Sequence, residues 1–188
     1  MAEIYSIKRQ YEYRVRSIRE DEKITPRNKE LILEFERDLF SEGLTLQRVL
    51  FYLNRLHMIA RWIEKDLDKL DKKDVKNLVA RIERSDYSEW TKKDYNVTIK
   101  KFYKWLNGGE EYPEQVKWIR TTMKKDRQKL PEDLLTEEEV KKLIESAENI
   151  RDKTMISVLY EGGLRIGELL DTKIKHVSFD RHGASILV

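Results

Sequence analysis

Apolar side chains recur at steps of three and four residues through residues 1–129, which is the period of an α-helix. Two stretches show a clear apolar stripe, one in residues 45–63 and one in residues 88–107. The first stripe consists of Val49, Leu53, Leu56, Ala60 and Ile63, and the second of Tyr95, Ile99, Phe102 and Leu106. The pattern predicts helices that turn these stripes towards a common core.

Residues that favour helix starts and stops stand at the ends of these stretches. The expected N-caps are Thr25 (followed by Pro26), Thr45, Asp71 and Ser88. Gly43 and the pair Gly108-Gly109 are the expected stops, and a short element around residues 115–122 follows. We therefore expect residues 1–129 to form a helical domain.

A polar segment, KKDRQKLPEDLL at residues 124–135, separates this domain from a second pattern and is the expected linker. The second domain, residues 130–188, opens with a capping box at Thr136 and Glu139. Two helices are expected next, from Asn149 to Tyr160 and from Leu164 to Leu170, and the segments KIKHVSFD and ASILV predict a β-hairpin. Because a two-stranded hairpin is marginal without further partners, we expect this domain to be a fragment.

The modest net charge of +3 hides an asymmetry between the two domains. Residues 1–129 hold 30 basic and 23 acidic side chains, a net charge of +7, whereas residues 130–188 hold 8 and 12, a net charge of −4. A basic excess concentrated in one helical domain favours a polyanionic partner such as nucleic acid.

Other features narrow the function classes. The chain has no cysteine, and its three histidines are scattered, so neither a disulfide framework nor a metal site is predicted. His57 lies beside the apolar stripe of its helix and is expected to be a packed or a surface histidine rather than a ligand of a metal. No glycine-rich phosphate loop and no long apolar run occur, so we expect a cytoplasmic protein that binds no membrane and needs no cofactor.

The helix expected over residues 88–107 carries the best candidates for contact with double-stranded DNA. Lys93, Asn96, Lys100 and Lys104 fall opposite its apolar stripe on a helical wheel. Lysines neutralise phosphates, and asparagine or threonine can reach base edges. The predicted contacts are Lys93, Asn96 and Lys100, followed by Lys92, Thr91, Arg48 and Arg55. The alternative interpretation is a solvated lysine face without a partner.

The segment VLYEGGLRIGELLDTKIKHVSFD, residues 158–180, resembles the opening of the catalytic domain of tyrosine recombinases, the phage integrase family. The family motif has the form L-Y-x-T-G-L-R-x-x-E-L-L, and Gly162 stands where threonine is common. Upstream, residues 44–62, 70–82 and 90–106 resemble the family's N-terminal core-binding domain. The resemblance implies a mainly α fold: an orthogonal, SAM-like helical bundle, then a truncated α+β catalytic fragment ending in the hairpin.

The resemblance also implies roles for individual residues. Arg165 would be the catalytic arginine that binds the scissile phosphate, because a guanidinium offers paired donors and stays charged. Glu168, three residues on, would brace it. The alternative is an exposed arginine paired with Glu168 and without function. Lys124, Lys125 and Arg127 of the linker would lie against DNA if the two domains clamp it.

The remaining catalytic residues of the family have no match within residues 1–188: the hairpin lysine, the His-x-x-Arg pair and the tyrosine nucleophile. The family exchanges DNA strands through a phosphotyrosine intermediate, with four protomers on two duplexes. We therefore expect this chain to bind DNA, associated with the nucleoid, without cleaving it. Two alternatives stay open at this point: a DNA-binding regulator with no catalytic parent, and a helical protein-interaction module.

Overall fold

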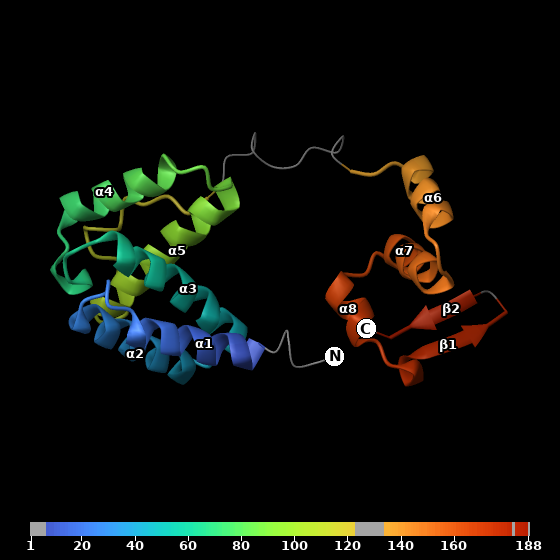
Figure 1. The fold of residues 1–188 in the computed structure, drawn as a ribbon, viewed down its shortest axis with the longest axis horizontal. Coiled ribbons are helices and arrows are strands. Elements are labelled where there is room, and N and C mark those ends of the chain that lie inside the picture. Colours follow the sequence, from blue (N-terminus) through green and yellow to red (C-terminus); the bar gives the residue numbers. More distant parts are fainter. Residues whose placement is uncertain (1–6, 123–133, 182, 188) are drawn as a thin grey trace. The chain divides into compact units, whose positions relative to one another are not determined.

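The computed structural model describes residues 7–122, 134–181 and 183–187, and divides the chain into two compact units, Met1–Gln128 and Lys129–Val188. Figure 1 shows a helical first unit and a second unit that combines helices with a β-hairpin. Each unit is described on its own below. The mainly α fold with a C-terminal hairpin is confirmed.

The described part of the first unit is helical, as its apolar period predicts. Its α-helices are α1 (Ile7–Glu20), α2 (Pro26–Ser41), α3 (Leu46–Trp62), α4 (Lys72–Glu83) and α5 (Glu89–Leu106), with a short 3-10 helix, η1 (Leu67–Lys69), before α4. The four predicted N-caps are confirmed, because the side chains of Thr25, Thr45, Asp71 and Ser88 each accept a hydrogen bond from a backbone N–H in the first turn. Gly43 follows α2 with a φ of 79°, a left-handed conformation that suits glycine.

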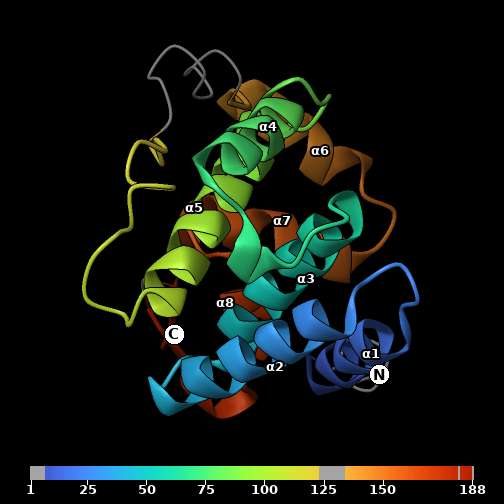
Figure 2. The same cartoon turned by 90° about the vertical axis from the view of Figure 1, so that its left-hand side faces the viewer.

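Helix α3 lies at the centre of this unit and contacts α1, α2 and α5 (Figures 1 and 2). The predicted stripe of α3 is buried, except that Ile63 is only partly covered. Phe35 of α2 and Phe102 of α5 are fully buried and meet edge to face, with ring centroids 5.4 Å apart. This packing holds α2, α3 and α5 around one core.

Residues 114–118 form turns rather than a regular helix, and they cover part of the first unit. Val116 is fully buried and Ile119 nearly so, and both belong to the core that α3 and α5 build. The segment after α5 is therefore an integral layer of the unit, and it covers a face of α5 that the helical wheel assigns to solvent.

Helix α1 is linked to α3 by a partly buried chain of polar side chains centred on His57. Nδ1 of His57, on α3, lies 2.8 Å from Nη1 of Arg14. Nε2 of the same ring lies 2.8 Å from Oδ2 of Asp21. Because arginine can only donate, Nδ1 must accept, and the ring proton sits on Nε2 facing the carboxylate. Arg61 adds an ion pair to Asp21 at 3.3 Å. Of the two positions expected for His57, packed or at the surface, the structure shows the packed one.

The second unit contains α6 (Glu137–Ser146), α7 (Ile150–Gly162), α8 (Ile166–Asp171), the 3-10 helix η4 (Ile174–His176), β1 (Val177–Asp180) and β2 (Gly183–Ile186). The strands are antiparallel, with Val177 opposite Ile186 and Asp180 opposite Gly183. The predicted capping box of Thr136 and Glu139 is confirmed. The first strand predicted from Lys173 was too long, because His176 N–H bonds to the carbonyl of Lys173 at 2.8 Å and closes a tight turn before Val177.

Little apolar surface is hidden within the second unit. Among its described residues, Val140 is the one apolar side chain that counts as buried. Large apolar side chains stand exposed on helices and strands alike, among them Ile150, Leu170, Ile174 and Phe179. The unit therefore has little core of its own.

We expect the first unit to lose stability as the pH falls below the ordinary histidine pKa of 6.5. Burial lowers the pKa of His57, outweighing the opposing bond to Asp21, so the unfolded state takes up the proton more readily. Protonation of Nδ1 would also break the bond from Arg14. His57→Gln, which can accept and donate in the same directions without titrating, should flatten this part of the pH profile.

Urea unfolding followed by tryptophan fluorescence measures this effect, because all four tryptophans, at positions 62, 90, 105 and 118, belong to the first unit. His176→Gln in the second unit is the matched control and should leave the profile unchanged. An equal pH slope for the wild-type chain and His57→Gln would contradict the assignment.

Candidate nucleic-acid interface and phosphate site

Two arginines of α3 share one aromatic ring at the surface of the first unit. The guanidinium of Arg48 lies 4.3 Å from the ring centroid of Phe51, and that of Arg55 lies 3.7 Å from the same centroid. Arg48 also donates from Nη2 to the hydroxyl of Tyr52 at 3.0 Å. Stacking on Phe51 holds both planar cations in place without neutralising them.

The two arginines differ in their charge partners. Arg55 donates to the carboxylate of Asp94 on α5 and to the carbonyl of Phe51, and its side chain is largely covered. Arg48 is exposed and has no carboxylate within ion-pair distance among the described residues. Arg48 is thus free to meet a phosphate, whereas Arg55 would first have to exchange Asp94 for it.

The first turn of α5 supplies another cation, which is partly exposed. Lys93 lies 4.8 Å from the ring centroid of Trp90, which is itself well exposed. Lys92 is mostly covered and pairs with Glu89 at 3.4 Å. Thr91 lies within the cap, where its N–H and hydroxyl meet the hydroxyl of Ser88. Lys93 is therefore the cation of this turn best placed for a polyanion.

The wheel placement of Asn96 on the outer face of α5 is wrong. Asn96 is only 6% exposed, and its Nδ2 donates to Glu83 of α4 at 3.2 Å. Helix α4 packs on this side of α5, and Trp118 and Ile119 line the same small pocket as Asn96. Its Oδ1 is buried without a hydrogen-bond partner. We therefore leave Asn96 out of the candidate interface.

Lys100 is also less available than the wheel suggests. Its Nζ donates to the carbonyl of Ile119 at 3.2 Å and lies 4.5 Å from the ring centroid of Tyr112. Lys104 approaches the same ring at 5.4 Å. The segment after α5 thus holds both lysines against the first unit. Lys124, Lys125 and Arg127 lie outside the described residues.

In the second unit, Arg165 and Glu168 form the pair that their spacing predicts. Arg165 stands directly before α8, and its backbone N–H donates to Oε2 of Glu168 at 2.7 Å while Nη1 donates to Oε1 at 2.7 Å. Both bonds lower the pKa of Glu168, and the bond from the backbone N–H has the larger effect. The Arg165 side chain remains 87% exposed, so its remaining donors face outward.

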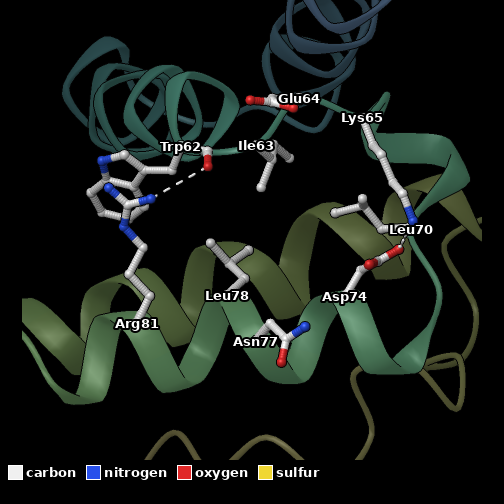
Figure 3. A pocket seen from close by; sticks show the side chains of 9 residues that line it. All are labelled: Trp62, Ile63, Glu64, Lys65, Leu70, Asp74, Asn77, Leu78 and Arg81. Carbon is white, nitrogen blue, oxygen red and sulfur yellow. Dashed lines mark hydrogen bonds and ion pairs between the residues drawn. The ribbon is translucent and has the colours of Figure 1, made fainter.

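The sequence did not predict a groove between the end of α3 and α4. Figure 3 shows this groove, of about 410 Å³, with Trp62 and Ile63 on one wall and Leu78 and Arg81 on the other. The guanidinium of Arg81 lies 5.1 Å from the Trp62 ring centroid, and Lys65 pairs with Asp74 at 2.8 Å. Lys65 is thus neutralised, and the carboxylates of Glu64 and Asp74 both line the groove, so it is poorly suited to a phosphate.

Among the described residues, no three His, Asp or Glu side chains gather in a way that could hold a metal ion. The helices of the described segments are also too short or too polar to cross a bilayer.

Comparisons with known proteins match both units. Residues 32–108 match the N-terminal SAM-like domain of phage integrases, and residues 133–187 match the phage integrase family. The two matches follow each other in the order of the two units. The chain belongs to the tyrosine recombinase family.

Its relatives include archaeal and bacterial recombinases. The tyrosine recombinase XerA of Pyrococcus horikoshii is 28% identical over 157 residues, which are 82% of this chain and 50% of the relative. XerA of Pyrococcus furiosus is 47% identical over 58 residues, 28% of this chain and 20% of the relative. A tyrosine recombinase of Thermosipho africanus is 29% identical over 137 residues, 68% of this chain and 47% of the relative. The chain spans about half the length of the curated relatives it matches. No solved structure matches it significantly.

We expect Asn96→Leu to stabilise the first unit by about 1 kcal/mol, because it removes a buried acceptor that lacks a partner at the cost of one partly covered hydrogen bond. Urea unfolding followed by tryptophan fluorescence measures the change. Asn96→Asp is the contrasting variant and should destabilise the unit, since it places a charge beside Glu83 where burial is expensive. A loss of stability in Asn96→Leu would mean that Oδ1 has a partner in solution.

Proposed function

We propose that this chain is the DNA-binding part of a site-specific tyrosine recombinase. The first unit holds double-stranded DNA against Arg48 of α3 and Lys93 of α5, and the second unit brings Arg165 to a phosphate of the same duplex. In this proposal residues 1–129 form the DNA-binding domain, and residues 130–188 form the first part of the catalytic domain. When bound to DNA, the protein is associated with the nucleoid.

The observation that carries the proposal is the state of Arg165 within the segment that matches the phage integrase family. Its guanidinium is almost fully exposed, yet Glu168 holds it from the backbone side and the side-chain side at once. The two hydrogen bonds to Glu168 limit the positions that the guanidinium can adopt, and its high exposure leaves its other donors accessible. The arrangement fixes a cation and leaves it open to an anion.

The chemistry follows from the charge that such a guanidinium can stabilise. When a tyrosine oxygen attacks a DNA phosphorus, negative charge grows on the non-bridging oxygens before the bond to the 5′ oxygen breaks. Arg165 can donate two parallel hydrogen bonds to those oxygens and stays charged at any working pH. Glu168 is a positioning residue in this scheme, because it touches the arginine and not the phosphate.

In the whole protein we propose cleavage through a covalent 3′-phosphotyrosyl bond with release of a 5′-hydroxyl. Four protomers on two duplexes would then exchange strands. Neither step requires a cofactor, because the energy of the broken phosphodiester is kept in the phosphotyrosyl bond. The linker cations Lys124, Lys125 and Arg127 would add contacts to the backbone between the two units.

We expect the 188-residue chain to bind duplex DNA with steep salt dependence. Lys93→Gln and Arg48→Gln should each lower the slope of log affinity against log salt by about 0.9, the value for one phosphate contact. Lys76→Gln is the matched control, because Lys76 is an exposed lysine of α4 without an ion pair in the described part of the chain. Fluorescence anisotropy with a labelled duplex measures the slopes.

An absence of DNA affinity even at low salt would overturn this proposal and favour the protein-interaction module. Affinity that is insensitive to both variants would place the DNA elsewhere on the chain.

We further expect no cleavage by this chain alone, because its match to the family lacks the tyrosine nucleophile, the hairpin lysine and the His-x-x-Arg pair. A duplex with a nick beside the scissile position traps covalent adducts, which denaturing gel electrophoresis detects as a shifted protein band. A tyrosine-linked adduct formed by the 188-residue chain would contradict this expectation.

A further inference from the structure

A second groove lies between α1 and α3, and most of its wall comes from residues that precede the SAM-like match at 32–108. Its volume is about 380 Å³, and it is lined by Arg9, Gln10, Tyr13, Arg14, Leu50 and Asn54. The first four belong to α1 and the last two to α3. Helix α1 thus lies outside the residues that match the SAM-like domain, and it forms one wall of this groove.

The groove is lined by cations and hydrogen-bond donors and by no carboxylate. Arg9 is exposed and forms no ion pair with any described residue, whereas two carboxylates, Glu64 and Asp74, line the groove in Figure 3. Arg14 is held by its bond to the neutral His57, which leaves its charge in place. Its Nε is buried without a hydrogen-bond partner. Two positive charges therefore border this groove without an acid on its walls.

The surrounding groups suit a phosphate diester better than another ligand. Guanidinium groups bind phosphate oxygens with paired donors, and the amides of Gln10 and Asn54 and the hydroxyl of Tyr13 add neutral donors. Leu50 is nearly buried and adds little surface, whereas the exposed ring of Tyr13 gives the groove an apolar border beside its donors. A phosphate group that stays partly exposed to solvent fits these donors.

The position of Asn54 connects this groove to the DNA surface proposed above. Asn54 and Arg55 are consecutive on α3, so their side chains project about 100° apart around the helix. Asn54 faces the groove with α1, whereas Arg55 pairs with Asp94 of α5. The uncovered ridge of α3 therefore runs between α1 on one side and α5 on the other.

We propose that the groove between α1 and α3 binds a phosphate of the DNA backbone, with Arg9 as the principal contact and Asn54 as a second. Helix α1 then serves as an additional wall of the DNA surface, on the side of α3 opposite to α5. This inference rests on the proposed function, because it assumes that duplex DNA lies along α3.

The test compares DNA binding by full-length variants of the 188-residue chain, measured by fluorescence anisotropy at several salt concentrations. Arg9→Gln should weaken binding roughly five- to tenfold at about 0.1 M salt and lower the salt slope by about 0.9. Arg37→Gln is the matched control, since Arg37 is an exposed arginine of α2 without an ion pair in the described segments. Circular dichroism should show the same helix content for both variants.

A second variant approaches the groove from α3. Asn54→Asp keeps the shape of the side chain and adds a negative charge, so it should weaken DNA binding at least as much as Arg9→Gln. Asn77→Asp on the exposed face of α4 is its control and should weaken binding far less. If Arg9→Gln and Asn54→Asp behave like their controls, the groove takes no phosphate.

The outcomes separate this inference from the proposed function. A wild-type chain that binds no duplex overturns both proposals. Binding that responds to Lys93→Gln and Arg48→Gln but not to Arg9→Gln overturns the role of α1 alone. Inorganic phosphate should compete no better than chloride at equal ionic strength. Strong competition that Arg9→Gln abolishes would identify a site for free phosphate and would also overturn the proposal.

Discussion

The first unit depends on the burial of α3 between three neighbouring helices. Its stripe of apolar residues packs against α2 and α5 through the Phe35 and Phe102 rings, and its opposite flank receives α1. Only a narrow ridge of α3 remains uncovered, and this ridge carries Phe51 with the two arginines that stack on it. A helix packed in this way holds its exposed side chains at fixed positions along and around its axis. Recognition of a regular duplex requires such fixed positions.

The second unit shows a different balance. Its Arg165 and Glu168 are organised by contacts within a single helical turn, whereas many of its large apolar side chains stay exposed among the described residues. The proposed phosphate site is thus built by contacts over three residues of sequence, and it does not depend on a large core. The proposed DNA surface and the proposed phosphate site therefore lie in two units that are ordered by different interactions.

Features set by neighbouring residues could be predicted from the sequence, and features set by distant segments could not. Thr45 and Ser88 were recognised as N-caps because a cap needs only the first turn of its own helix. The Arg165 pair with Glu168 was predictable for the same reason. Asn96 was placed on the wrong side, because the wheel of α5 cannot register that α4 and the later segment with Ile119 cover that face. The groove beside α1 likewise depends on how α1 packs against α3, and the sequence offered only scattered arginines as a signal.

The hairpin at the end of the chain has a further physical consequence. In a sheet of two strands each strand is an edge, so β1 and β2 both present backbone N–H and C=O groups that the other strand does not use. Exposed Phe179 and Leu187 border these edges with apolar surface. Among the described residues no third strand pairs with the hairpin, so each outer edge has the backbone groups that a further strand would need.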